Sequence, residues 1–265
     1  MRVKEIMNEK HPSIYDDDLA TKARAIIRDY SLRILPVIDK NKKLLGLVTR
    51  RNILTISSSV SALRAKGIMT LPKKIATTEE DVYTVIRELI QVGKWYAPVI
   101  DSIQNKAYKG VLGLENFIEA VIRTSPEKLA KPVSGIMSTS IPTCSPDDGV
   151  DNIWRLMQDK TLAGLPVVNK GRLVGIVTQK DLLAGGEVMP TFEAKKGRHR
   201  ASPKVSSIMK REVLTVTPDV KAIRVAKVMI SKDIGRVPVV DDDGKLIGMV
   251  DRKDVARMLV KQGGS

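Results

Sequence analysis

Apolar and polar positions along this chain follow one pattern that returns four times. In its last copy, a short β-branched run at 213–216 precedes an amphipathic stretch at 220–230 and two apolar runs at 237–240 and 246–250, and a closing stretch ends at Leu259. The amphipathic stretch has apolar residues at helical spacing, whereas the short runs are bounded by turn signals. We therefore predict the order strand, helix, strand, strand, helix.

Capping and turn signals separate these predicted elements. Thr217-Pro218-Asp219 is typical of a helix start, with Thr217 or Asp219 as the cap and the proline near the first turn. The run from Asp241 to Gly244 predicts a hairpin turn of the Asp-Gly kind between the last two strands.

A fixed spacing indicates that the four copies are one structural module. In each copy an Ile-Met step precedes the proline of the second apolar run, and methionine and proline are always 29 residues apart. A constant internal distance with variable gaps between copies is typical of a repeated unit. The pairs are Met7 and Pro36, Met69 and Pro98, Met137 and Pro166, and Met209 and Pro238.

The other copies follow the same plan, and the second diverges most. Its turn is longer, and residues 109–113 are its less certain match to the third strand; the clear matches are 44–48 and 173–177. The predicted helical stripes are Leu19, Ala23, Ile26 and Ile27 in the first copy, and Val150, Ile153, Leu156 and Met157 in the third.

A unit of about 55 residues is too small to bury both faces of its sheet. We therefore expect the copies to pair, helix against helix, which gives two pairs. The expected divisions are repeat 1 at 1–62, repeat 2 at 63–125, a linker at 126–132, repeat 3 at 133–186, an exposed basic insertion at 187–204, repeat 4 at 205–260 and a tail at 261–265.

Three marks together resemble the CBS domain family. They are the Ile-Met step, the Pro-Val strand, and a glycine followed by two apolar residues, a threonine and, three positions later, an aspartate. The last mark spans Gly175 to Asp181 in repeat 3 and Gly248 to Asp254 in repeat 4. The resemblance implies a mixed α/β (α+β) fold of four β-α-β-β-α CBS repeats, paired into two Bateman modules. Stand-alone proteins of this type are common in archaea.

In this family the clefts between paired repeats bind adenosine-containing ligands. The resemblance therefore implies an adenine nucleotide or an S-adenosyl-type ligand, and no required cofactor. An aspartate carboxylate can accept hydrogen bonds from both ribose hydroxyls, a threonine at a helix start suits a phosphate, and an arginine before the Pro-Val strand can neutralise it. Repeat 3 carries the complete pattern, with Thr178 and Asp181.

Repeat 4 departs from the pattern at one position. It keeps Asp254, but Asp251 stands where the threonine belongs, and a second carboxylate repels a phosphate. An uncharged or cationic adenosyl group would suit this cleft, unless Arg236 offsets the charge. Helix capping is the competing interpretation in every repeat, because threonine and aspartate at these positions also satisfy the first helical turn.

Repeats 1 and 2 carry asparagine in place of the aspartate, and asparagine bonds a ribose less strongly. Trp95, three residues before Pro98, is expected to fill the cleft of repeat 2, which then holds no nucleotide. The residues at the motif positions are Arg33, Thr49 and Asn52 in repeat 1, and Gly113 and Asn116 in repeat 2.

Composition narrows the class of protein. There is no run of about 18 apolar residues, so we expect no membrane span, and the start of the chain lacks the apolar stretch of a secretory signal. Cys144 is the single cysteine, which excludes an intramolecular disulfide and a cysteine-built metal site. His11 and His199 are the only histidines, and no nucleophile-base set accompanies them. We therefore expect a cytoplasmic protein that is not an enzyme.

The charge balance points toward a polyanionic partner. The formal net charge is +15, and the excess is spread over the chain, with +8 in residues 1–132 and +7 in residues 133–265. The alternative is a solubility or thermophilic adaptation, although heat adaptation usually raises both signs of charge together.

The basic clusters suggest contact with a large RNA through phosphates, since no RNA- or DNA-reading motif is present. Basic archaeal four-CBS proteins that resemble this chain occur on ribosomal subunits, which implies a hibernation-type translation inhibitor with the ribosome and its rRNA as partners. The alternatives are DNA, or a sensor of AMP, ATP or S-adenosylmethionine that regulates an enzyme or transporter, with the basic runs as solvated loops. A homodimer is compatible with both the nucleic-acid-binding and the ligand-sensor interpretation. The candidate RNA contacts are Lys195, Lys196, Arg198, His199, Arg200, Lys204, Lys210, Arg211, Lys42, Lys43, Arg50, Arg51, Lys73 and Lys74.

Overall fold

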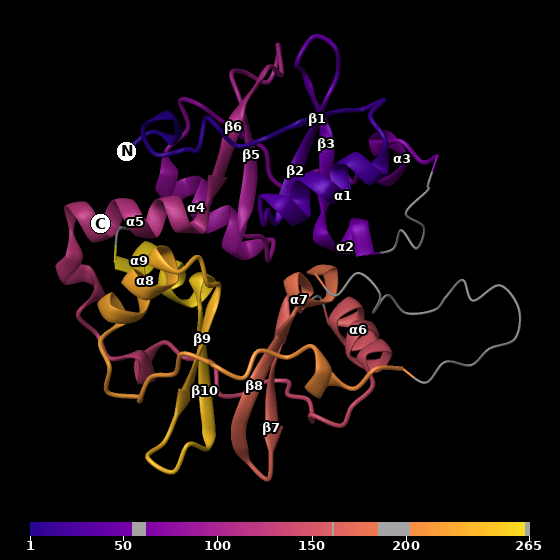
Figure 1. The fold of residues 1–265 in the computed structure, drawn as a ribbon. Coiled ribbons are helices and arrows are strands. Elements are labelled where there is room, and N and C mark those ends of the chain that lie inside the picture. Colours follow the sequence, from indigo (N-terminus) through magenta and orange to yellow (C-terminus); the bar gives the residue numbers. More distant parts are fainter. Residues whose placement is uncertain (55–61, 161, 185–201, 263–265) are drawn as a thin grey trace, which may run out of the picture.

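The computed structural model confirms a mixed α/β fold built from four related units (Figure 1). It describes residues 1–54, 62–160, 162–184 and 202–262. Most of the expected insertion at 187–204 lies outside the described residues.

The first half of the chain contains two successive units with the expected order of elements. Repeat 1 contains the 3-10 helix η1 (Val3–Glu5), β1 (Ile14–Tyr15), α1 (Ala20–Asp29), β2 (Ile34–Ile38), β3 (Leu44–Thr49) and α2 (Arg50–Leu54). Repeat 2 contains α3 (Ala65–Ile68), β4 (Ala76–Thr77), α4 (Val82–Gln91), β5 (Tyr96–Ile100), β6 (Tyr108–Gly113) and α5 (Leu114–Thr124).

The second half repeats this order after the 3-10 helix η2 (Pro126–Leu129). Repeat 3 contains η3 (Val133–Gly135), α6 (Val150–Asp159), β7 (Gly164–Asn169), β8 (Arg172–Thr178) and α7 (Gln179–Ala184). Repeat 4 contains η4 (Val205–Ser207), α8 (Ala222–Ser231), β9 (Arg236–Val240), β10 (Leu246–Asp251) and α9 (Arg252–Gln262).

Each unit is built on an antiparallel hairpin, and the first predicted strand is weak. β1 and β4 pair in parallel with β2 and β5 over two residues each. In the second half, the described residues show only single bridges at that place, Cys144 to Val167 and Val216 to Val239. The prediction of a strand at 213–216 is therefore wrong except at Val216. The predicted turn at 241–244 is confirmed, since the Gly244 amide donates to the Asp241 carbonyl at 3.0 Å.

The segment that follows each Ile-Met step crosses to the third strand of a neighbouring repeat. These crossings join repeat 1 to repeat 2 and repeat 3 to repeat 4, and each is an antiparallel bridge. Because every repeat lends a segment to its partner, the two members of a pair are interlocked into one module. The bridges are Asn8 to Val111, Thr70 to Leu47, Ser138 to Met249 and Lys210 to Ile176.

This crossing explains why the Ile-Met step and the motif glycine occur together. A Cβ built on Gly248 would lie 2.4 Å from the Met137 sulfur, and one built on Gly175 would lie 2.9 Å from the Met209 sulfur. Gly46 faces the Met69 sulfur at the same 2.9 Å. A side chain at any of these glycines would displace the methionine from the partner repeat.

A second pairing between repeats, made by the segment that precedes the Ile-Met step, occupies the positions where the helix starts were predicted. The Pro218 and Val220 carbonyls accept hydrogen bonds from Ser134 and Val133 of repeat 3, at 3.0 and 2.8 Å. These residues therefore pair with another segment, and α8 begins only at Ala222. Leu19 behaves similarly: it precedes α1, bridges to Arg64 and is 42% exposed, so the prediction that it belongs to the buried stripe is wrong.

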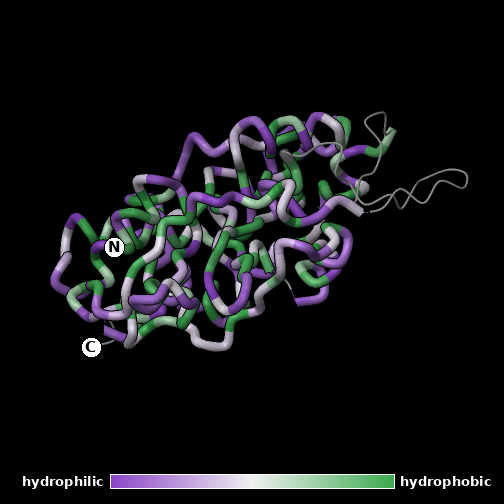
Figure 2. Tube along the Cα trace, turned by 60° about the horizontal axis from the view of Figure 1, so that its bottom comes forward, coloured by the Kyte–Doolittle hydropathy of each residue, from purple (hydrophilic) through white to green (hydrophobic). Residues whose placement is uncertain are grey.

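Helices pack across the two modules, which corrects the expected helix pairing within them. α1 and α2 contact α7, whereas α5 contacts α8 and α9, and α4 also contacts α9. In Figure 1 these helices form a band, with the strands of the first module above it and those of the second module below. One apolar core accordingly combines repeats 2 and 4 and another combines repeats 1 and 3. Figure 2 shows hydrophobic stretches alternating with hydrophilic ones along the whole trace.

Candidate functional site

Each module contains two candidate clefts, and each cleft is built from both of its repeats. One repeat supplies the end of its third strand and the start of its last helix, and the partner supplies the crossing segment. We name each cleft after the repeat that supplies the helix. The motif residues and the residue after the Ile-Met step are thereby brought together from distant parts of the chain.

In the repeat-3 cleft, Thr178 and Asp181 cap the last helix reciprocally. Asp181 Oδ2 accepts from the Thr178 amide at 2.9 Å and from its hydroxyl at 2.6 Å, and the Asp181 amide donates to the Thr178 hydroxyl at 3.3 Å. The capping interpretation therefore holds for one carboxylate oxygen. The other, Oδ1, lies 3.6 Å from Nζ of Lys210, which the crossing segment of repeat 4 carries. A cation and a second acceptor oxygen thus share the mouth of this cleft.

Lys210 is one of the candidate RNA contacts from the sequence, and the structure places it beside Asp181 of repeat 3. A signal for this position exists in the sequence, because Lys210 directly follows the Ile-Met step as Asn8, Thr70 and Ser138 do in the other copies. The periodicity alone does not show that this position crosses to the partner.

In the repeat-4 cleft, two carboxylates occupy the motif positions. Asp254 Oδ2 accepts from the Asp251 amide at 2.9 Å, and Asp251 Oδ1 accepts from the Asp254 amide at 3.0 Å. Asp254 Oδ1 lies 3.2 Å from Nη1 of Arg257. Burial of Asp254, followed by the charge of Asp251, raises the pKa of the Asp254 carboxyl to about 6. This cleft therefore presents an aspartate that is mostly, but not fully, ionised near neutral pH.

Asparagine performs the same capping in the first module. The Thr49 amide donates to Asn52 Oδ1 at 2.9 Å, and the Gly113 amide donates to Asn116 Oδ1 at 2.8 Å. An amide has one oxygen where a carboxylate has two, and here that oxygen caps the helix. The first module consequently lacks the second acceptor oxygen that Asp181 and Asp254 offer to a ligand.

Side chains of the chain itself fill the space between the sheets of the first module. Buried Ile34, Leu47 and Val111 pack with Tyr96 and Tyr108. His11 lies beside them, and because a carbonyl only accepts, its Nε2–H donates to the Ile34 carbonyl at 3.0 Å. Burial lowers the pKa of His11, in keeping with a neutral ring.

The second module has different residues at the equivalent positions. By strand register, Gly164 of β7 corresponds to Ile34, and Arg236 of β9 corresponds to Tyr96. Arg236 donates to the Gly164 carbonyl at 2.6 Å. A glycine and a guanidinium therefore replace an isoleucine and a tyrosine, which makes this region more polar in the second module than in the first.

Trp95 lies where the two modules meet, and the expectation that it fills the repeat-2 cleft is corrected. The guanidinium carbons of Arg33 and Arg236 each lie 6.0 Å from its ring centre, and a Cβ on Gly235 would lie 2.8 Å from the ring. The ring is a platform for two arginines from different modules, an arrangement that favours cation–π attraction. Tyr96, Tyr108 and His11 occupy the cleft region instead.

A buried ion-pair network joins the modules beside this platform. Arg252, 1% exposed, lies 2.8 Å from Asp233 Oδ1 through Nη2 and 3.1 Å from Glu115 Oε2 through Nη1. Asp233 Oδ1 also lies 3.1 Å from Nη1 of Arg33. Burial works against ionisation of Asp233, but Arg33 and Arg252 together keep its pKa below the ordinary value.

Sequence reasoning missed Arg252, although a positional signal exists. In three repeats the side chain of the first residue of the last helix donates a hydrogen bond to a backbone carbonyl in or just after the preceding helix of the same repeat. Arg50 Nε donates to the Leu32 carbonyl at 2.7 Å, Gln179 to the Leu162 carbonyl at 3.0 Å and Arg252 to the Met229 carbonyl at 3.1 Å. A long hydrogen-bond donor recurs at this position of the repeat.

The structure changes the assignment of two candidate RNA contacts. Arg50 also donates to the Ser31 carbonyl, and burial, with Arg33 nearby, lowers its pKa to about 10, so it faces the interior. Lys74 is paired with Glu80 at 2.5 Å and Glu88 at 2.6 Å. Both side chains have partners within the chain and are not free to contact phosphates.

The other basic candidates divide into exposed and undescribed residues. Lys204 pairs with Asp147 at 2.7 Å, and Arg211 donates to the Ser206 carbonyl at 3.4 Å. The remaining exposed candidates are Lys42, Lys43, Arg51 and Lys73, whereas Lys195, Lys196, Arg198, His199 and Arg200 lie outside the described residues.

The described residues contain neither a candidate metal site nor a candidate membrane-spanning helix. Among residues 1–54, 62–160, 162–184 and 202–262, no group of three or more His, Cys, Asp or Glu side chains could hold a metal ion. Within the same residues, none of the helices is long and apolar enough to cross a membrane.

Comparison with known proteins identifies the repeats. The family model described as CBS domain matches residues 3–59, 133–185 and 205–261, well over half of the chain. The protein MJ1225 of Methanocaldococcus jannaschii is 27% identical over 94% of this chain and 95% of its own length.

Two solved structures share the whole fold. The crystal structure of MJ1225, described as a candidate archaeal homologue of g-AMPK, has a TM-score of 0.85 at 22% identity and covers 98% of this chain and 100% of its own. A conserved protein from Pyrococcus horikoshii has a TM-score of 0.68 at 21% identity, with the same coverage. At these identities the likeness concerns the fold.

Proposed function

Because the chain belongs to the CBS domain family, we propose that it is a non-catalytic sensor of an adenosine-containing ligand that binds in the clefts of the second module. One observation carries this proposal. Asp181 and Asp254 each use one carboxylate oxygen to cap a helix, and the other oxygen lies beside a cation, Lys210 or Arg257. A ribose has two adjacent hydroxyls that can donate to such an oxygen, and hydrogen bonds to a charged acceptor are the stronger kind.

The two clefts suit different adenosyl groups. Lys210 and the Thr178 hydroxyl stand beside Asp181, so the repeat-3 cleft suits a nucleotide phosphate. In the repeat-4 cleft, Asp251 repels a phosphate, and Arg236 is engaged with the Gly164 carbonyl. This cleft therefore suits an uncharged or cationic adenosyl group, as in S-adenosylmethionine.

Calorimetric titration with AMP, ATP and S-adenosylmethionine tests this function. We expect at least one nucleotide to bind, and Asp181→Asn to weaken it by about tenfold or more, because the amide keeps the cap and loses the charged acceptor. Asp242→Asn, in an exposed turn, is the matched control and should bind as the unchanged protein does. Absence of heat with all three ligands, at concentrations up to the millimolar range, would contradict the sensor function.

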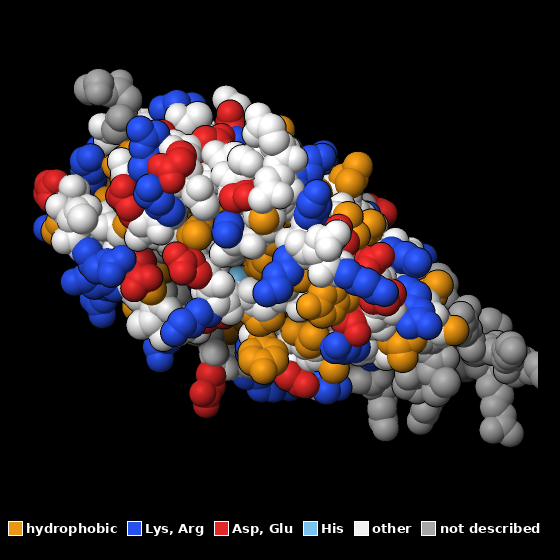
Figure 3. All heavy atoms as spheres, turned by 90° about the horizontal axis from the view of Figure 1, so that it is seen from above, with side chains coloured by type: hydrophobic (Ala, Val, Ile, Leu, Met, Phe, Trp, Pro, Cys, Tyr) orange, Lys and Arg blue, Asp and Glu red, His pale blue; other side chains and the backbone are white. Residues whose placement is uncertain are grey.

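Ribosome or other RNA binding is a second candidate, favoured by the net charge of +15. Figure 3 shows Lys and Arg side chains spread over one face among Asp and Glu, which suits contact with a broad phosphate surface more than a single patch. If about six to ten phosphates are contacted, affinity should fall about 10³–10⁵-fold between 50 and 200 mM salt. Co-sedimentation with ribosomal subunits across a salt series measures this, and no co-sedimentation at low salt would exclude the ribosome as the partner.

A further inference from the structure

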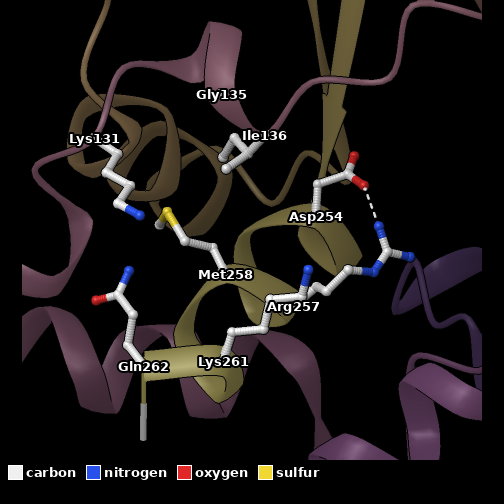
Figure 4. A pocket seen from close by; sticks show the side chains of 8 residues that line it. All are labelled: Lys131, Gly135, Ile136, Asp254, Arg257, Met258, Lys261 and Gln262. Carbon is white, nitrogen blue, oxygen red and sulfur yellow. Dashed lines mark hydrogen bonds and ion pairs between the residues drawn. The ribbon is translucent and has the colours of Figure 1, made fainter.

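A cavity of about 440 Å³ lies in the second module between η3 and α9. It runs along α9 from Asp254, near the start of the helix, toward Lys261 in its last turn (Figure 4). Its volume falls in the range of small-molecule sites, about 300–1,000 Å³. The cavity therefore has room for a ligand beyond the ribose-binding position at Asp254.

The spacing of residues along α9 creates one wall. Asp254, Arg257, Met258 and Lys261 are three or four residues apart, so they share one face of the helix. In Figure 4 these side chains lie along the helix and border the open space. This wall combines two cations with the apolar side chain of Met258, which is 6% exposed.

The opposite wall comes from a different segment, which the backbone holds in place. Lys131 and Ile136 flank η3, which the pairing of Val133 with the Val220 carbonyl fixes against repeat 4. The Lys131 carbonyl itself accepts from the Ala222 amide at 2.8 Å. Tertiary structure thus places Lys131 in the lining of the same cavity as Arg257 and Lys261. A lysine in the last turn of a helix is favoured by the helix dipole, but the dipole does not explain why Lys261 lines the same cavity as Lys131.

The charges around the cavity are not balanced. Three cations face one carboxylate, and Asp254 is already paired with Arg257 at 3.2 Å. Neither Lys131 nor Lys261 forms an ion pair with any of the described residues. The formal excess of two positive charges matches the charge of a phosphate monoester near neutral pH, about −1.5 to −2, and lysines and arginine are its usual partners.

We propose that this cavity binds a small phosphate monoester, with Lys131, Arg257 and Lys261 holding the phosphate and with Met258 and Ile136 contacting the rest of the ligand. The phosphate position lies along α9 beyond the ribose contact at Asp254, in a cavity that Asp254 also lines, and the proposal does not require that an adenosyl ligand binds in the repeat-4 cleft. Arg257 is common to both places, so occupation of one alters the charge around the other.

Methyl NMR of the full chain labelled at its methionine methyl groups tests this site. Met258→Leu identifies the Met258 signal, and glycerol 3-phosphate is titrated at constant ionic strength, with glycerol and inorganic phosphate as separate arms. We expect glycerol 3-phosphate to shift the Met258 signal saturably with a Kd of about 1 mM or below, which is a binding free energy of about −4 kcal/mol. Glycerol should leave the signal unchanged.

Two double variants test whether the lysines that line the cavity bind the phosphate group. Lys131→Gln with Lys261→Gln should weaken the response at least tenfold. Lys40→Gln with Lys106→Gln removes the same charge from exposed turns of the first module and should leave the response unchanged. The proposal is overturned if glycerol 3-phosphate does not shift the Met258 signal, or if inorganic phosphate shifts it and glycerol 3-phosphate does not. It is also overturned if the two double variants bind glycerol 3-phosphate equally well. Because Lys131 and Lys261 are exposed, their replacement should not disturb folding.

Discussion

Replacing Arg252 by methionine is expected to destabilise the folded protein by about 3–5 kcal/mol, because one partner of a buried ion pair is removed while the other stays. Asp233 can turn toward water, since its side chain is 60% exposed. Glu115 cannot do so as readily: its Oε2 atom is fully buried, and Arg252 is the cation beside it. The Glu115 carboxylate would then lie between repeats 2 and 4 without its ion-pair partner, with Arg33 as a more distant cation.

Urea unfolding at neutral pH measures the loss of stability. Lys253→Met is the matched control, since Lys253 is the next residue of α9 and forms no ion pair in the described part of the chain; it should cost less than about 0.5 kcal/mol. Adding Glu115→Gln to Arg252→Met should recover part of the loss, because it removes the stranded charge. A loss below about 1 kcal/mol for Arg252→Met would show that the network does not stabilise the meeting of the two modules.

Replacing Asp254 by asparagine is expected to increase stability at alkaline pH and to weaken ribose binding in the repeat-4 cleft. Burial and the charge of Asp251 raise the pKa of Asp254 from its ordinary value to about 6, so the folded protein holds this proton more tightly than the unfolded chain does. The associated stability is complete below the unfolded pKa and is lost as pH rises through about 6. The ionised carboxylate therefore costs stability at pH 8, and asparagine removes that cost.

We expect Asp254→Asn to gain about 1–3 kcal/mol at pH 8, and less at pH 5, since one pKa unit corresponds to about 1.4 kcal/mol. Loss of the Arg257 ion pair reduces the gain. The cap should persist, because Asn52 and Asn116 accept the same hydrogen bond in repeats 1 and 2.

Unfolding at the two pH values, with Asp242→Asn as a surface control, measures the gain. A stability difference that does not change with pH would contradict the assignment of the raised pKa to Asp254. If the repeat-4 cleft binds S-adenosylmethionine, calorimetry should show that Asp254→Asn weakens this binding by about tenfold or more, whereas Asp242→Asn leaves it unchanged.

The module itself could be predicted from the sequence because its determinants are local. Strand hydrophobicity, the turn at 241–244 and the helical spacing of Val150 and Ile153 act between near neighbours, and the structure reproduces them. Even the uncertain third strand of repeat 2 is confirmed, since Gly110 pairs with Val99 as Gly46 pairs with Val37. The position of Asp181 and Asp254 at a helix start could be predicted for the same reason.

Other features depended on partners that are distant in sequence. The signals at Thr217 and Asp219 indicate a helix start, yet the Pro218 and Val220 carbonyls accept hydrogen bonds from repeat 3. Trp95 looked like a residue that fills a cleft, and it lies between arginines of two modules. Lys210 looked like one base among many, and the crossing of its segment brings it to Asp181.

The amino-acid sequence by itself determined the repeat, the order of its elements and the capping pair that opens each last helix, because turn chemistry and side-chain spacing act over a few residues. Tertiary structure decided which repeats share a core and which side chains fill the space between the sheets of the first module. It also decided which cations lie beside the carboxylate oxygens that do not cap a helix. Those outcomes follow from segments that cross between repeats and from helices that pack across modules, where residues far apart in the chain compete for the same space and the same hydrogen bonds.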